Sequence, residues 1–144
     1  MKKTTISNET YLREIWNQAL INFDFVICTE ELKDCSLLDV KILKLLYENP
    51  EYKIKELITL LGVPNSTMTN AINRLTKKNL LERRLSEQDL RSFDLALTPY
   101  GKLGVERHYE GENNLFKQLL APLTKEEQAT FLTLCEKVFI KKRN

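Results

Sequence analysis

The hydrophobic period of this sequence changes at Asn79. Up to that residue, apolar side chains recur at helical spacing in two segments, 53–61 and 65–78, which a Gly-Val-Pro turn at 62–64 separates. Beyond it, apolar and polar residues alternate on both sides of a polar loop at 86–89, which is the pattern of a β-hairpin. The alternating residues are Leu81, Arg83, Leu85, Phe93, Leu95 and Leu97. A short helix, a tight turn, a second helix and a hairpin follow one another in a winged helix-turn-helix domain.

Four further helices are predicted around this unit, with expected ranges of 7–32, 37–47, 99–120 and 124–140. Three of them begin at recognisable signals, which are Ser36 ahead of Asp39, Thr98 ahead of Pro99, and Thr124 ahead of Glu127. We therefore expect a mainly α fold with a small β-hairpin wing. Its single domain, 1–144, would hold a winged helix-turn-helix lobe at 36–98, flanked by outer helices at 7–32 and 99–142.

The first expected helix carries two apolar faces. One stripe begins at Leu12 and ends at Ile27, and a second on the opposite side consists of Ile21, Phe25, Cys28 and Leu32. A surface helix of a monomer needs only one apolar face. The second face is therefore expected to pack against another subunit or against the chain's own terminal helix.

The positive charge of the chain is concentrated in its middle third. The net charge of the 144 residues is only +2, from 22 basic and 20 acidic side chains. Residues 1–52 carry 6 basic and 9 acidic groups, whereas residues 53–92 carry 8 and 4. This local surplus is compatible with a polyanionic partner and lies over the expected helix-turn-helix and hairpin.

The outward face of the segment 65–78 suits a DNA major groove. No acidic residue occurs in this segment, so no carboxylate on that face would repel phosphate. Short polar side chains let a helix approach base edges, asparagine pairs with adenine, and a basic end meets the backbone. The candidate contacts are Ser66, Thr67, Thr69, Asn70, Asn73, Arg74 and Lys77. The alternative interpretation is an ordinary solvated helix face.

The hairpin offers a second candidate contact with DNA. Its basic residues are Arg83, Arg84 and Arg91, and Asp89 lies two positions before the last of them. An arginine at a loop tip suits the negative potential of a narrow minor groove. Asp89 would fix the guanidinium of Arg91 through a salt bridge, or would simply stabilise the turn.

The run from Leu60 to Gly101 resembles the multiple antibiotic resistance regulator (MarR) family of bacterial transcription factors. The shared features are the Leu-Gly-x-Pro turn, the Ser-Thr pair at 66–67, Arg74-Leu75, Lys77-Lys78, the Asp89-x-Arg91 wing motif and Leu97-Thr98-x-x-Gly101. The wing motif is fairly specific in this setting. Two positions depart from the family pattern, because Asn70 replaces a frequent arginine and Asn79 replaces the usual glycine.

The resemblance implies a homodimeric DNA-binding regulator, with repression as the expected direction of control and release by a small effector. The outer helices 7–32 and 99–142 would form the dimer interface. Arg91 would enter the minor groove, supported by Asp89. Two recognition helices one DNA turn apart imply a pseudo-palindromic operator with half-sites about 10 bp apart.

Family members commonly respond to a small ligand, an oxidant or a metal, and the chain offers candidates for each. An effector pocket could be lined by Trp16, Phe23, Phe25, Tyr47, His108 and Glu112, although aromatic residues at helical spacing also form cores. His108 and Glu112 lie one helical turn apart, where such a pair binds metal, senses pH or forms a buried hydrogen bond. No metal site is predicted, since the chain has one histidine.

The cysteines do not form a recognisable redox motif. Cys28, Cys35 and Cys135 contain no C-x-x-C pair, and Cys135 falls on an inward stripe. The acidic residues Glu30 and Glu31 near Cys28 disfavour a reactive thiolate there, whereas the sequence leaves the role of Cys35, beside Asp34, open. A metal- or redox-sensing variant of the same regulator stays an alternative.

Several classes of protein are excluded by missing patterns. The sequence has no phosphate-binding glycine loop and no nucleophile elbow, so no enzyme or cofactor is predicted. It also lacks a signal-peptide pattern and an uncharged apolar run long enough for a membrane span, and we expect a cytoplasmic protein. The rival function is a winged helix that binds protein rather than DNA.

Overall fold

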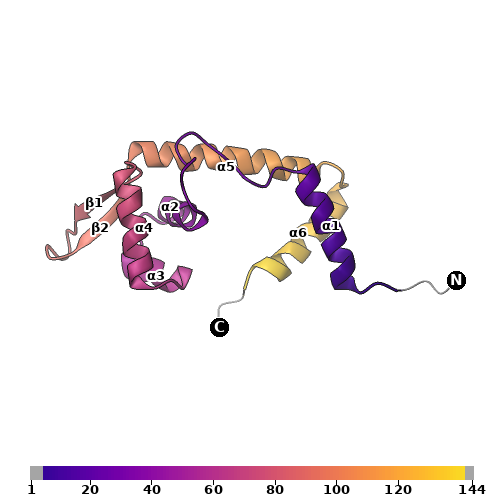
Figure 1. Cartoon of the computed structure of the whole chain (residues 1–144), viewed down its shortest axis with the longest axis horizontal. Coiled ribbons are helices and arrows are strands. Elements are labelled where there is room, and N and C mark those ends of the chain that lie inside the picture. Colours follow the sequence, from indigo (N-terminus) through magenta and orange to yellow (C-terminus); the bar gives the residue numbers. More distant parts are fainter. Residues whose placement is uncertain (1–4, 142–144) are drawn as a thin grey trace. The chain divides into compact units, whose positions relative to one another are not determined.

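The computed structural model describes residues 5–141 and contains six helices and one two-stranded sheet over that range (Figure 1). This confirms the predicted mainly α fold with a β-hairpin wing. The elements are α1 (Asn8–Asn22), α2 (Leu37–Glu48), α3 (Ile54–Leu61), α4 (Asn65–Lys77), β1 (Leu81–Leu85), β2 (Phe93–Leu97), α5 (Pro99–Leu120) and α6 (Lys125–Phe139).

The chain divides into two compact units. The winged unit, Cys28–Glu110, contains α2, α3, α4, both strands and the first half of α5. The outer unit contains α1, the second half of α5 and α6. Each unit is described by itself below.

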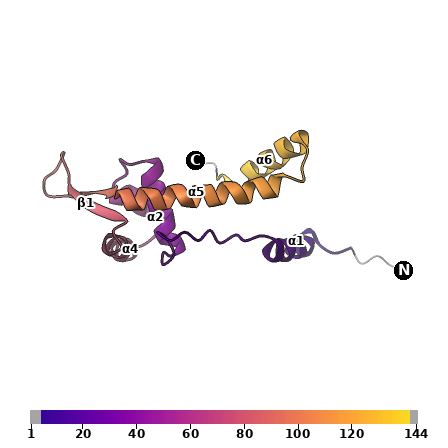
Figure 2. The ribbon, with the colours of Figure 1, turned by 90° about the horizontal axis from the view of Figure 1, so that it is seen from above.

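The winged unit is held by a leucine-rich core beneath α4. Helix α4 contributes its predicted inward stripe, and Ile42, Leu43 and Leu46 of α2 pack against it with at most 2% exposure. Strands β1 and β2 pair antiparallel with Leu81 opposite Leu97 and Leu85 opposite Phe93, and the loop between them extends away from α2 and α4 (Figure 2). The buried stripe of α4 consists of Met68, Ala71, Ile72 and Leu75.

The ends of α3 and α4 confirm the two predicted stop signals. Gly62 follows α3 with φ of 63°, and Asn79 follows α4 with φ of 58°. The amide of Asn79 donates to the carbonyl of Thr76, and that of Leu80 donates to Leu75, both at 3.0 Å. These two bonds form a Schellman motif, which satisfies carbonyls at the end of α4. Asparagine tolerates the left-handed conformation that the motif requires.

The junction between α4 and α5 explains the Thr98-x-x-Gly101 pattern. The hydroxyl of Thr98 donates to the carbonyl of Asn79 at 2.6 Å and accepts from the amide of Gly101 at 2.9 Å. A Cβ atom on Gly101 would lie 2.1 Å from the carbonyl oxygen of Leu80. Glycine is therefore required where the first turn of α5 crosses the end of α4.

The expectation of one helix over 7–32 was wrong, because α1 ends at Asn22 and Phe23 is extended. The carboxylate of Asp24 accepts the amide of Val26 at 3.0 Å, a local bond that competes with helical bonding. The aromatic and β-branched residues that follow Asn22 also have a lower helix propensity than straight-chain residues. The proposed second apolar face of this helix does not exist, since Leu32 is 5% exposed in the core of the winged unit.

The outer unit leaves many of its large apolar side chains exposed. Within α1 and α6 as the structure describes them, no residue is buried. Trp16 stacks on Phe25 with ring centroids 5.6 Å apart, and Phe23 lies 6.2 Å from Phe25. The exposed large apolar residues are Ile6, Tyr11, Leu12, Ile15, Trp16, Leu20, Ile21, Val26, Phe116, Phe131, Leu132, Leu134, Val138, Phe139 and Ile140. Over residues 5–141 we find no helix with the length and apolar character needed to cross a bilayer.

Candidate nucleic-acid interface

The outward face of α4 is polar and carries no negative charge. No acidic residue occurs between Asn65 and Lys77, and the basic residues lie in the last turn. The predicted contacts are exposed except Thr67, which is half-buried. The hydroxyl of Thr69 donates to the carbonyl of Asn65 at 2.9 Å, which turns its proton back toward the helix.

Two of the predicted contacts are hydrogen-bonded to residues outside α4. The guanidinium of Arg83, on β1, donates to the side-chain oxygen of Asn73 at 2.5 Å. Arg74 donates from Nη2 to Oδ1 of Asp39 at 2.8 Å. Helix α4 is thus bonded to the hairpin through Asn73 and to α2 through Arg74.

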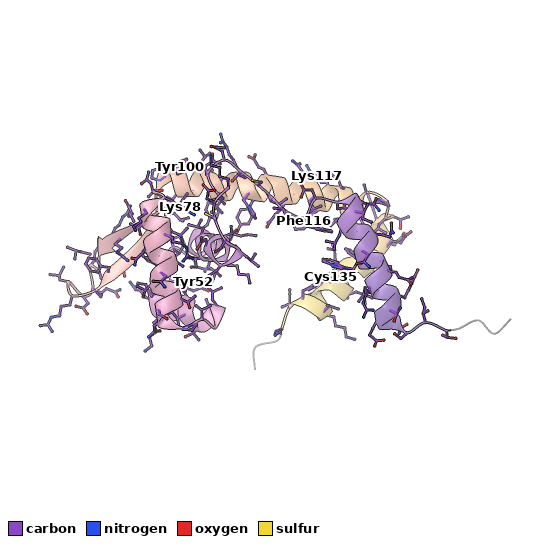
Figure 3. All side chains as sticks on the ribbon, in the orientation of Figure 1. Tyr52, Lys78, Tyr100, Phe116, Lys117 and Cys135 are labelled. Atoms are coloured by element: carbon purple, nitrogen blue, oxygen red, sulfur yellow. The ribbon has the colours of Figure 1, made fainter. Side chains whose placement is uncertain are left out.

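The basic end of α4 is also attached to the segment before α2. The ammonium group of Lys78, at the end of α4 (Figure 3), donates a hydrogen bond to the backbone carbonyl of Asp34. Lys78 keeps its positive charge, but this hydrogen bond holds its side chain against the segment before α2. Lys77 is exposed and makes no hydrogen bond or ion pair to the other described residues, so its ammonium group stays available to a phosphate.

The wing residues separate onto two faces of the hairpin. Neighbouring residues of a strand point to opposite faces, so Arg83 meets α4 whereas Arg84 lies on the other side. There the Nε of Arg84 donates to Glu82 at 2.7 Å, which neutralises its charge locally. Arg83 and Arg84 therefore do not belong to one basic cluster.

Asp89 stabilises the backbone of the wing loop rather than the guanidinium of Arg91. Its carboxylate accepts the amide of Arg91 at 3.0 Å, and no ion pair joins these two side chains in the described structure. The buried hydroxyl of Ser86 accepts the amides of Gln88 and Asp89 at 3.3 Å. Hydrogen bonds from side chains to the backbone therefore stabilise the loop. They fix the backbone position of Arg91, whereas its exposed guanidinium is not held by Asp89.

Three ion pairs that the sequence did not indicate join elements of the winged unit. Lys53, which precedes α3, contacts Asp94 of β2 at 2.7 Å. Asp39 is paired with Arg74, and Glu31 with Arg107 of α5, and both carboxylates are buried. The partners are far apart in sequence, so local spacing offered no signal except the capping position of Asp39.

The candidate effector residues fall into separate groups. In the outer unit, Trp16 and Phe23 both contact Phe25. In the winged unit, the ring of Tyr47 lies 5.7 Å from that of Tyr109 in an edge-to-face arrangement, and its hydroxyl donates to Glu106 at 3.2 Å. Partial burial and this hydrogen bond raise the pKa of Tyr47, so it remains a donor. His108 is 8% exposed and Glu112 is half-buried.

The winged unit contains a groove that the sequence did not indicate. Its volume is about 610 Å³, and it lies between the end of α2, the hairpin and the start of α5. Leucines and charged side chains from β1, β2 and α5 both line it. The lining residues are Leu46, Tyr47, Pro50, Arg84, Leu85, Glu87, Asp94, Leu95, Ala96, Leu97, Lys102 and Glu106.

The cysteines are free thiols in three different settings. Cys28 is exposed, whereas Cys35 and Cys135 are half-buried. Burial raises the pKa of the Cys35 thiol. Among residues 5–141, no group of three or more His, Cys, Asp or Glu side chains is arranged to hold a metal ion.

Known proteins similar to this chain are bacterial helix-turn-helix regulators. A family model described as the MarR family matches residues 36–93. YfiV of Bacillus subtilis (strain 168), an uncharacterized HTH-type transcriptional regulator, is 31% identical over 133 residues, which cover 87% of this chain and 83% of YfiV.

Solved structures share the fold of this chain over nearly its whole length. Streptococcus pneumoniae FabT, crystallised in complex with DNA, matches with a TM-score of 0.75 and 24% identity over 91% of this chain and 92% of FabT. Streptomyces coelicolor PcaV, in complex with its natural ligand, matches with a TM-score of 0.62 and 25% identity over 92% of both chains.

Proposed function

Because this chain belongs to the MarR family of helix-turn-helix transcriptional regulators, we propose that it binds double-stranded DNA sequence-specifically as a homodimer. The acid-free, exposed face of α4 carries this proposal. A solvated helix face has no reason to exclude carboxylates, whereas a face that meets phosphate does.

Ser66, Thr67 and Asn70 are the residues that we assign to base recognition. They lie in the first half of α4, ahead of its basic last turn. Asn70 offers a donor and an acceptor to the major-groove edge of adenine. Lys77 at the other end contacts a phosphate and sets the position of the helix without reading sequence.

Arg91 is the wing residue that we assign to the minor groove. Its guanidinium is exposed and makes no hydrogen bond or ion pair to other described residues, while its amide is held by Asp89. The fixed backbone of the loop lowers the conformational entropy lost on binding, and the guanidinium, which has no partner to give up among the described residues, is ordered only when it meets DNA. Arg83 contributes by supporting Asn73, and Arg84 is the weakest DNA candidate because Glu82 neutralises it.

The outer unit supports dimerisation. More than a dozen large apolar side chains of α1, α5, α6 and the adjoining segments are exposed, and exposed apolar side chains in this number favour an interaction site over a solvated surface. In a two-fold dimer each α4 would enter the major groove of one half-site, so the operator is a pseudo-palindrome with half-sites about 10 bp apart.

Repression relieved by a small effector completes the proposal. The chain shares its fold with PcaV, a regulator solved with its natural ligand. The aromatic cluster around Phe25 and the groove beside Tyr47 are the two surfaces suited to such a ligand. Regulation of transcription requires access to DNA, which is consistent with a cytoplasmic protein.

Selection of bound duplexes from random DNA tests the proposal. We expect enrichment of a pseudo-palindrome, weaker binding after Lys77→Ala, and a changed base preference after Asn70→Ala. Lys117→Ala, a substitution of the same type on α5 outside α4 and the hairpin, is the matched control and should leave the affinity unchanged. Recovery of no enriched sequence would favour a winged helix that binds protein instead.

A further inference from the structure

One buried carboxylate connects the start of α2 to the recognition helix. The side chain of Asp39 is 1% exposed. Its Oδ2 accepts the amide of Ser36 at 3.1 Å and thereby closes the capping box of α2, while its Oδ1 accepts Nη2 of Arg74 at 2.8 Å. Both oxygens are therefore used, one by each helix.

This arrangement is unfavourable for a simple electrostatic contact with DNA. A negative charge beneath a helix that approaches phosphates lowers affinity by Coulomb repulsion. It also cancels much of the positive charge of Arg74, whose side chain is 46% exposed. Buried ion pairs contribute little net stability, because desolvation offsets their attraction, but a guanidinium and a carboxylate fix geometry.

The geometry that this pair fixes is the orientation of α4 on α2. Helix α2 is anchored in the core by Ile42, Leu43 and Leu46, so it is a rigid reference. Arg74 lies in the last turn of α4, on the flank of the DNA-facing surface. A bond from that flank to α2 opposes rotation of α4 about its own axis, which would move the base-reading side chains out of register.

We propose that Asp39 is a positioning residue for DNA recognition, and that it acts through Arg74 by holding α4 in the rotation at which its outer face meets the bases. The inference rests on the proposed function, and it reassigns Arg74 from a phosphate contact to an orienting one. The signature is a loss of specific binding upon removal of a negative charge.

The test compares Asp39→Asn, Arg74→Met and their double variant on two probes. One is the labelled duplex that the wild-type protein selects from random DNA, and the other is poly(dI-dC). Asparagine cannot accept at both positions, so Asp39→Asn should weaken binding to the selected duplex roughly tenfold or more and leave poly(dI-dC) binding nearly unchanged. The double variant should bind no more weakly than the weaker single variant, because both substitutions remove one interaction.

Salt dependence separates positioning from phosphate contact. If Arg74 acts by position, Arg74→Met leaves the slope of log affinity against log salt unchanged. A phosphate contact would reduce that slope by about 0.9 and would overturn the proposal. Unchanged or tighter binding of the selected duplex by Asp39→Asn would also overturn it.

Two further variants distinguish a loss of α4 orientation from a general loss of folding. Ser36→Ala removes the cap hydroxyl of α2 but keeps the pair with Arg74, and it should retain specific affinity within about twofold. An equal loss by Ser36→Ala and Asp39→Asn would assign the effect to α2 stability and overturn the proposal. If Asp39→Asn does not fold, Arg74→Lys keeps the charge, loses the planar fork and should lower the ratio of specific to non-specific affinity. If the wild-type protein binds no duplex, that result contradicts the proposed function itself, and the inference, which rests on that function, is contradicted as well.

Discussion

Replacement of Gly101 by alanine should destabilise the winged unit at the junction of α4 and α5. The new Cβ would lie 2.1 Å from the carbonyl oxygen of Leu80, whereas ordinary contacts begin at 3.4 Å. The obstacle is backbone, so the helices must separate. That carbonyl also accepts the amide of Thr98 at 3.2 Å, and this hydrogen bond would be strained or lost.

The expected cost is about 2–4 kcal/mol, from overpacking of about 1–3 kcal/mol and a hydrogen bond of about 1 kcal/mol. For a chain of this size the midpoint of thermal unfolding should fall by roughly 10 °C. Denaturant unfolding followed by circular dichroism measures the free energy of unfolding directly.

Gly62→Ala is the matched control for this substitution. Gly62 has φ of 63°, yet a Cβ there would meet nothing within 4 Å. Its cost should therefore be the conformational cost alone, about 1 kcal/mol. If Gly101→Ala were no more destabilising than Gly62→Ala, the close approach of α5 to Leu80 would not be a constraint on the fold and the reasoning would be refuted.

Three other outcomes are expected. Arg91→Ala should weaken binding to the selected duplex while size-exclusion chromatography still gives the wild-type oligomer; an unchanged affinity in an anisotropy titration at fixed salt would remove the role assigned to the wing. Phe139→Asp should shift the protein toward monomer in analytical ultracentrifugation, because it places a charge among the exposed apolar side chains of α6, and an unaltered dimer would exclude α6 from the interface. Cys35 should react with iodoacetamide more slowly than exposed Cys28, since burial raises the pKa of the Cys35 thiol and the reactive thiolate forms only at higher pH; equal rates for the two peptides by mass spectrometry would contradict this.

The winged unit was predictable because its signals are local. The inward stripe of α4, the stop at Gly62 and the left-handed Asn79 each follow from residues within one or two helical turns. The end of α1 was missed for an equally local reason. Asp24 bonds the amide of Val26, and such competition does not appear in a hydrophobic pattern.

The functional surface was predictable in outline and not in detail. Composition alone indicated the acid-free face of α4, and strand alternation could have separated Arg83 from Arg84. The pairing of Asp39 with Arg74 was beyond the sequence, because 35 residues separate the partners and only the packing of α2 against α4 brings them together. Residues that orient other residues are visible only once the helices are placed.

The salt dependence of operator binding tests the central claim most directly. Fluorescence anisotropy would follow the wild-type protein on its selected duplex and on a shuffled duplex of equal composition, over a series of salt concentrations. Binding through α4 and the wing predicts that log affinity falls linearly with log salt and that the selected duplex binds at least about 10³-fold more tightly. Affinity that ignores salt, or equal affinity for both duplexes, would contradict a sequence-specific DNA-binding function.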